Sequence, residues 1–228
     1  GANHGQVGGA VSASPLTQPR PAANMMTQQL DQIAFSVVDV QRTERWFRDA
    51  FGFIPAGGTR SFRGWGARHV QGLPGAASTC WWLVDRSEHF QIELFQFEAP
   101  LARLMPADFR PCDIGYSRVG FWVQDYDRTL ERLAALGTPP LTAPVGEAGG
   151  RRVCVRNPEG VFIEVMEDDP LRGCTRDARP DCRVAARSVT LSVPDLEKSK
   201  RFFMGALGMP ESTAALRRAE HEALWGLG

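Results

Sequence analysis

The fold of this chain is decided by a segment, QIAFSVVD at residues 32–39, that occurs three times. The second copy reads RVGFWVQD at residues 118–125, and the third reads SVTLSVPD at residues 188–195. Each copy predicts a β-strand that ends at an aspartate, and a helix-like stretch that ends at a glycine follows it. A unit that recurs in this way indicates an assembly of similar modules.

The first copy continues into a complete module. Asp39 is placed to cap a helix that runs to about Phe51, and Gly52 is placed to end it. After a loop rich in glycine and arginine, strands are expected at residues 79–84 and 89–97, and the module is assigned the order β-α-β-β-β. The apolar stripe of the predicted helix consists of Val40, Trp46, Phe47, Ala50 and Phe51.

The second copy predicts a helix capped by Asp125 and a hairpin around NPEG at residues 157–160. The third copy supplies a strand and a helix over about residues 196–207. We therefore expect an α+β fold of paired β-α-β-β-β modules with a partial third module, which a longer natural chain or another chain would complete. The expected units are a flexible tail at 1–29, modules at 30–110 and 111–169, a linker at 170–186 and the partial module at 187–228.

Composition excludes several classes of partner. The 26 basic and 26 acidic residues cancel, so neither a nucleic acid nor an anionic membrane surface is expected to bind. No apolar run approaches the roughly 20 residues that a membrane helix needs. The expected partner is a small molecule, and the sequence allows a homodimer.

The five cysteines favour a cytoplasmic protein, because an odd number is more usual in a reducing compartment. Cys80 and Cys154 lie in strand-like runs and are expected in the core. The alternative is an exported protein with a disulfide between Cys174 and Cys182, which are close in sequence.

Strand alternation locates a candidate site. Successive side chains point to opposite faces of a strand, so the apolar positions that face the helix define the other face. This other face carries four polar residues at matched positions of the two modules, namely Gln32, Glu93, Arg118 and Glu164. Glu93 and Glu164 are the candidates for acid or base chemistry, and Gln32 and Arg118 for substrate binding.

Two further residues are candidates for ligand binding. His69 lies near Trp65 in the glycine-rich stretch, and such loops often border ligand sites. Trp122 is one of three strand tryptophans, with Trp81 and Trp82, of which at least one is expected to line the cavity.

The strand–Asp–helix–Gly pattern and the stretch NPEGVFIE at residues 157–164 resemble the vicinal oxygen chelate superfamily over residues 30–209. That superfamily includes glyoxalase I, bleomycin-resistance proteins and extradiol dioxygenases. The resemblance implies a curved, eight-stranded mixed sheet around a cleft that usually holds a divalent metal. In one type of glyoxalase I the ligands are Gln, Glu, His and Glu, and the matching positions here carry Gln32, Glu93, Arg118 and Glu164.

Arg118 departs from that ligand set, because a guanidinium stays protonated and has no lone pair to donate to a metal. We expect Arg118 to replace the metal's charge by pairing with Glu93, Glu164 or both, and no cofactor to be bound. The predicted function is a glyoxalase-like protein that binds a small organic molecule without the usual metal. The alternative is a lyase, isomerase or dioxygenase that holds Zn, Ni, Fe or Mn through Gln32, Glu93 and Glu164.

Overall fold

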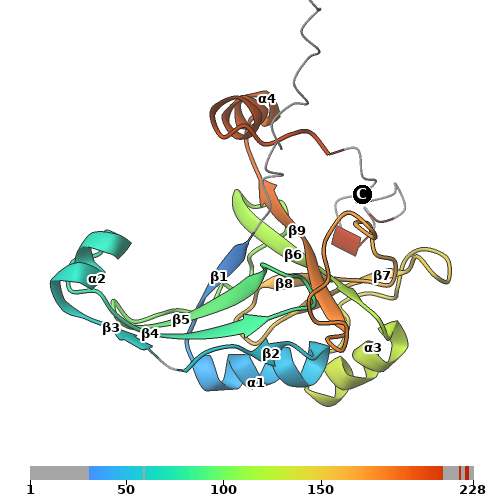
Figure 1. Cartoon of the computed structure of the whole chain (residues 1–228), viewed down its shortest axis with the longest axis horizontal. Helices are drawn as coiled ribbons and strands as arrows, with labels where there is room; N and C mark the ends of the chain where they lie inside the picture. Colours follow the sequence, from blue (N-terminus) through green and yellow to red (C-terminus); the bar gives the residue numbers. More distant parts are fainter. Residues whose placement is uncertain (1–30, 59, 213–220, 222–223, 226–228) are drawn as a thin grey trace, which may run out of the picture.

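The computed structural model describes residues 31–58, 60–212, 221 and 224–225 (Figure 1). The tail predicted at residues 1–29 lies outside this range. The described chain has the α+β class that the repeats predict.

The first module follows the predicted β-α-β-β-β order, with a short strand and a helix added. Asp39 caps its first helix by accepting a hydrogen bond from the Arg42 amide at 2.9 Å, and Gly52 ends that helix at a positive φ of 84°. The predicted glycine-rich loop is wrong in part, because it contains a short strand and the helix that carries His69. The elements are β1 Gln32–Val37, α1 Val40–Phe51, β2 Ile54–Pro55, β3 Arg60–Phe62, α2 Gly64–Gln71, β4 Ala77–Val84 and β5 Gln91–Ala99.

The second module and the third copy form the rest of the described chain. Asp125 precedes α3, but its carboxylate pairs with Arg183 and makes no capping hydrogen bond to the helix. The strand of the third copy begins at Val184, inside the segment predicted to be a linker. The elements are β6 Gly115–Val123, α3 Tyr126–Ala135, β7 Arg152–Arg156, β8 Phe162–Met166, β9 Val184–Ser192, α4 Leu196–Lys200 and the π-helix η1 Arg201–Ala206.

The strands form two mixed sheets rather than the single eight-stranded sheet that the resemblance implies. The first sheet has the order β1-β5-β4-β2, with β3 also paired to β4, and β1 runs parallel to β5. The second has the order β7-β8-β6-β9, in which β6 runs parallel to β8 and antiparallel to β9. The physical reason for the division is that β9 occupies the edge of β6 that a strand of the first module would need.

The two modules are joined through their helices and through buried aromatic rings. Figure 1 shows α1 and α3 next to each other on the same side of the sheets. All five residues of the predicted α1 stripe are buried. Phe47 and Phe51 of α1 make edge-to-face contacts with Phe121 of β6 at centroid distances of 6.1 and 5.4 Å, so one apolar core spans both modules.

A buried carboxylate adds a polar link between the modules. Glu159, in the turn between β7 and β8, accepts hydrogen bonds from the Thr43 hydroxyl at 2.6 Å and from the Val38 amide at 3.0 Å. Arg42 pairs with the same carboxylate at 3.0 Å. A negative charge at the N-terminus of α1 also suits the helix dipole.

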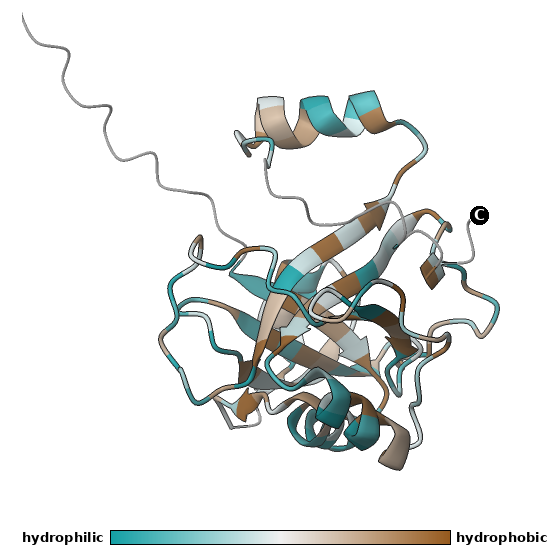
Figure 2. Ribbon diagram, turned by 90° about the vertical axis from the view of Figure 1, so that its right-hand side faces the viewer, coloured by the Kyte–Doolittle hydropathy of each residue, from teal (hydrophilic) through white to brown (hydrophobic). Residues whose placement is uncertain are grey.

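The helix of the third copy lies apart from both sheets (Figures 1 and 2). Leu196 and Leu207 match Val40 and Phe51 of the first copy in sequence. Val40 and Phe51 are 6% and 1% exposed, whereas Leu196 and Leu207 are 62% and 45% exposed. The third copy therefore keeps the apolar stripe of the repeat, but no surface among the described residues buries this stripe.

The disulfide considered above is not present in the structure. Cys174 is exposed, whereas the free thiol of Cys182 is buried and lies 3.4 Å from the Gly52 carbonyl oxygen. Cys80 and Cys154 are buried, as predicted. None of the helices in the described part of the chain has the length and apolar character needed to cross a membrane.

Replacing Phe47 with alanine is expected to destabilise the protein strongly, since its ring contacts Phe35, Trp46, Phe53 and Phe121. Removing a fully buried phenylalanine side chain costs about 3–5 kcal/mol of unfolding free energy. Urea denaturation of Phe47→Ala measures the loss. The exposed Val70→Ala serves as the control, and an equal effect of both substitutions would contradict this account of the core.

Candidate functional site

The polar residues singled out by strand alternation lie on the faces of the two sheets that point away from α1 and α3. We call these the distal faces. Gln32 and Glu93 belong to the distal face of the first sheet, where Glu93 is paired in register with Ala34 and Trp82. Arg118 and Glu164 belong to the distal face of the second sheet. The structure therefore divides the predicted four-residue site into two pairs.

The first pair is held by a short series of hydrogen bonds between β1 and β5. The Gln91 amide group donates to Gln32 Oε1 at 2.6 Å, and Gln32 Nε2 in turn donates to Glu93 Oε2 at 2.5 Å. Gln32 is exposed, whereas Glu93 is largely buried. This arrangement fixes the orientation of the Gln32 amide and leaves Glu93 Oε1 outside the series.

Burial raises the pKa of Glu93 above its ordinary value, because desolvation disfavours the charged form. Hydrogen bonds from Gln32 and Trp82 act in the opposite direction, but they do not outweigh desolvation. Glu93 is therefore a carboxyl group that accepts a proton more readily than an exposed glutamate does.

The second pair is part of a buried ionic cluster. Glu164 lies between two arginines, with Arg118 Nε at 3.5 Å and Arg152 Nη1 at 3.1 Å from its oxygens. Arg152 also pairs with Asp168 at 3.0 Å. Arg118 thus pairs with Glu164, which is one of the alternatives predicted from the sequence. The side chains that affect the pKa of Glu93 are Gln32 and Trp82.

The distal face of the second sheet is covered by residues near the C-terminus. Leu224 and Trp225 are buried against Cys154 and Phe162. The Arg118 guanidinium carbon lies 4.0 Å from the centre of the Trp225 ring, which is a close cation–π contact. Arg118 and Glu164 are consequently inaccessible to a ligand in this structure.

Sequence reasoning missed Arg152 and Trp225. The alternation in RVCVR at residues 152–156 places Arg152 on the same face as Cys154, so the strand pattern contained a signal for the arginine. Trp225 packs against Cys154 and Phe162, which lie more than sixty residues before it in the chain, and strand alternation does not predict such a contact.

The other two predicted ligand residues lie apart from Glu93. Trp122 shares the distal face of the second sheet, where it is buried, and the guanidinium carbons of Arg86 and Arg187 lie 5.6 and 6.0 Å from its ring centre. His69 is exposed on α2, where its ring lies 4.1 Å from that of Trp65 and its Nδ1 lies 2.9 Å from the Trp65 carbonyl oxygen.

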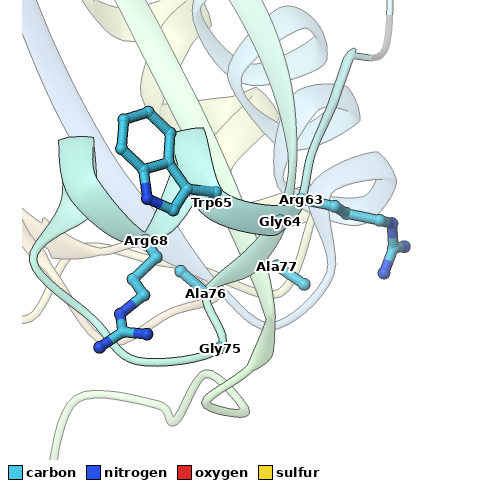
Figure 3. Close-up of a pocket in the computed structure, with 7 residues that line it drawn as sticks. All are labelled: Arg63, Gly64, Trp65, Arg68, Gly75, Ala76 and Ala77. Carbon is cyan, nitrogen blue, oxygen red and sulfur yellow. The ribbon is translucent and has the colours of Figure 1, made fainter.

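Two surface pockets flank α2. One, of about 410 Å³, lies beside Trp65 and Arg68 of α2, and Figure 3 shows both side chains. The other, of about 270 Å³, includes Arg68 and His69 in its lining. Gln71 joins α2 to the first sheet by donating a hydrogen bond to the Ser78 hydroxyl at 3.1 Å. The pockets thus adjoin the sheet that carries Glu93, at its β3–β4 end (Figure 1).

Comparison with known proteins identifies the family. The profile of the glyoxalase/bleomycin resistance protein/dioxygenase superfamily matches residues 31–155. The chain belongs to this superfamily. Comparison with curated proteins gives no match.

Solved structures of this superfamily share the fold. A glyoxalase family protein from Bacillus cereus is 25% identical, with a TM-score of 0.52, and the match covers 62% of this chain and 97% of that one. Glyoxalase I from Zea mays is 18% identical, with a TM-score of 0.51, and the match covers 79% of this chain and 55% of that one. The latter shows similarity of fold alone.

The residues of one chain do not fit the divalent metal that the superfamily usually binds. Gln32 and Glu93 supply oxygen atoms on one sheet, whereas Glu164 lies on the other sheet between two guanidinium groups. A metal at Glu164 would have to displace these cations. Within the ranges that the structure describes, no three His, Cys, Asp or Glu side chains are placed to share a metal ion.

Replacing Glu164 with glutamine is expected to destabilise the fold, because Arg118 and Arg152 would remain buried with less compensating charge. Breaking a buried ion pair from one side costs about 3–5 kcal/mol of unfolding free energy. Chemical denaturation of Glu164→Gln measures this loss against Glu131→Gln on the exposed side of α3. If Glu164→Gln loses less unfolding free energy than Glu131→Gln does, the ionic cluster around Glu164 does not stabilise the fold.

Proposed function

We propose that this protein binds a small organic molecule on the distal face of the first sheet, with Glu93 as the principal hydrogen-bond acceptor. The observation that supports this proposal is the Gln32–Glu93 pair, which combines an exposed amide with a desolvated carboxylate. The matching pair of the second sheet, Arg118 and Glu164, is covered and internally neutralised.

The chemistry of Glu93 defines one feature of the ligand. A carboxylate only accepts hydrogen bonds, so the ligand must present an N–H or O–H group. A carboxylate has about four lone-pair sites, so the hydrogen bonds from Gln32 and Trp82 leave an acceptor position for the ligand donor. In a desolvated position this charge-assisted bond is stronger than one between neutral groups.

The side chains around Glu93 define a second feature of the ligand. Trp82 lies opposite Glu93 on β4, and Phe95 follows two residues later on the same face of β5. Both side chains are partly exposed, and Phe95 stacks on Phe97 at a centroid distance of 5.8 Å. Aromatic walls beside a polar anchor favour a planar or apolar ligand body.

The alternative function is a metal-dependent lyase, isomerase or dioxygenase that uses Gln32, Glu93 and Glu164. No contact in the described chain favours it, because Glu164 is engaged by Arg118 and Arg152 on the other sheet. Elemental analysis of the purified chain separates the two functions. A stoichiometric metal that is lost in Glu93→Gln would support the alternative and contradict the proposal.

A thermal-shift screen tests the proposed ligand class. The probes are planar organic molecules, each paired with an analogue in which the N–H group is methylated. We expect selected N–H compounds to raise the melting temperature, their methylated analogues to have little effect, and Glu93→Gln to weaken binding at least tenfold, because a hydrogen bond to a charged group contributes about 1.5–3 kcal/mol. The control is Glu131→Gln, and binding that survives in Glu93→Gln would refute the role of Glu93.

The affinity for such a ligand is expected to depend on pH. The acceptor is lost when Glu93 is protonated, so binding weakens as the pH falls through the pKa of Glu93. Because burial raises this pKa, the loss begins at a higher pH than it would for an ordinary glutamate. Titration calorimetry from neutral to acidic pH, with a ligand that does not itself titrate, measures the effect, and a flat profile would contradict it.

A further inference from the structure

The segment around α2 carries only basic charges. Acidic and basic residues are equal in number over the whole chain, but between Asp49 and Asp85 the sequence contains no aspartate or glutamate. The same stretch contains Arg60, Arg63 and Arg68. Charges of one sign that are gathered in this way give a local positive potential, which attracts anions.

Arg63 has an acidic partner from another part of the first sheet. Its guanidinium forms an ion pair with Glu98 of β5, and its Nε donates a hydrogen bond to the Ser61 hydroxyl at 2.9 Å. Glu98 also accepts a hydrogen bond from the Thr79 hydroxyl at 3.1 Å. The charge of Arg63 is therefore compensated within the protein.

Arg68, by contrast, remains available to a ligand. Its side chain is exposed, and within the described part of the chain no ion pair or hydrogen bond engages its guanidinium. It belongs to the lining of both pockets beside α2. A guanidinium presents its donors in a planar fork that matches the two oxygens of a carboxylate. A single guanidinium of this kind matches a ligand with one negative charge.

Trp65 supplies an aromatic surface beside Arg68. Residues three apart on a helix are neighbours on its surface, and both side chains line the larger pocket (Figure 3). The indole is 76% exposed, but its ring centre lies 4.1 Å from that of His69, which restrains it. A restrained ring loses less conformational entropy when a planar ligand stacks on it, so Trp65 suits an aromatic ligand body.

Small residues complete the lining of the larger pocket. Gly64 and Gly75 have φ values of 80° and 69°, which disfavour any other residue, so the backbone conformation keeps these positions without side chains. Ala76 and Ala77 contribute only methyl groups. The volume of about 410 Å³ lies within the range of about 300–1,000 Å³ that is typical of small-molecule sites.

We propose that the larger pocket beside α2 binds a planar aromatic monocarboxylate, with Arg68 holding the carboxylate and Trp65 stacking on the ring. This inference goes beyond the proposed function and does not rest on it. The ligand of Glu93 must donate an N–H or O–H group, whereas the ligand of Arg68 presents a carboxylate, which only accepts. A protein that binds no ligand at Glu93 would leave this second site intact.

Titration calorimetry of the full chain with naphthoate tests the ligand class. At neutral pH this probe is a monoanion without an N–H or O–H group, so it does not report on Glu93. We expect one site per chain, and binding weaker by about tenfold or more for methyl naphthoate, which lacks the charge. The saturated analogue decahydronaphthoate keeps the charge but has no aromatic face, and is expected to bind about threefold more weakly or worse. Absence of naphthoate binding, or equal affinity for its methyl ester, would overturn the proposal.

Substitutions of the two anchor residues test where the probe binds. We expect Arg68→Gln to weaken naphthoate binding by about tenfold or more, and Trp65→Ala by about threefold or more. Both side chains are exposed, so the melting temperature of the free protein is expected to change little. Arg45→Gln, at an exposed position of α1 in the same module, removes the same charge and is expected to keep the affinity. Unchanged binding in Arg68→Gln, or equal weakening in Arg45→Gln, would refute the site.

Discussion

The antiparallel pairing of β6 with β9 determines how the rest of the molecule is arranged. A strand has two edges, and β8 and β9 occupy both edges of β6. The first strand of the first module therefore cannot extend the second sheet, and the modules meet instead through their helix-covered faces. Phe47, Phe51 and Phe121 supply the apolar part of that junction, and Glu159 supplies the polar part. Because Glu159 is buried and accepts from Val38 and Thr43, it also fixes the N-terminal end of α1 against the other module.

The matched strand positions of the two sheets have different surroundings. On the second sheet, Glu164 is surrounded by guanidinium groups and Trp225 covers Arg118, so charges that alternation assigns to an open face become part of a core. Charges buried in this way require compensation, and Arg152 and Asp168 provide it. On the first sheet, the position of Arg118 is taken by Gln32, which is neutral and exposed. A neutral amide needs no counter-charge, and it engages the adjacent Glu93 through a hydrogen bond instead of an ion pair.

Much of the fold could be predicted from the repeated segment, because strand, cap, helix and stop are encoded locally. Asp39, Gly52 and the stripe that includes Phe47 behave as their positions predict. The helix at Gly64–Gln71 could not be recognised, since its glycines weaken the helical signal. Asp125 shows the limit of a local rule, because its carboxylate binds the distant Arg183 instead of capping α3. The division of the candidate site between two sheets was also beyond the sequence, since alternation assigns a face to each residue but does not say which strands share a sheet.

The third copy shows why strand and helix patterns alone cannot locate a binding surface. Its helix retains the spacing of apolar residues found in α1, yet Leu196 and Leu207 are exposed where Val40 and Phe51 are buried. The converse holds for Leu224, which is buried, whereas Val70, its match in sequence between LWGLG at residues 224–228 and VQGLP at residues 70–74, is exposed. Since the matched residues have similar intrinsic hydrophobicity, the difference arises from the neighbouring surfaces that each copy meets. Hydrophobic burial is non-directional and depends on the apolar area removed from water, so the same segment can serve as core in one module and as accessible surface in another.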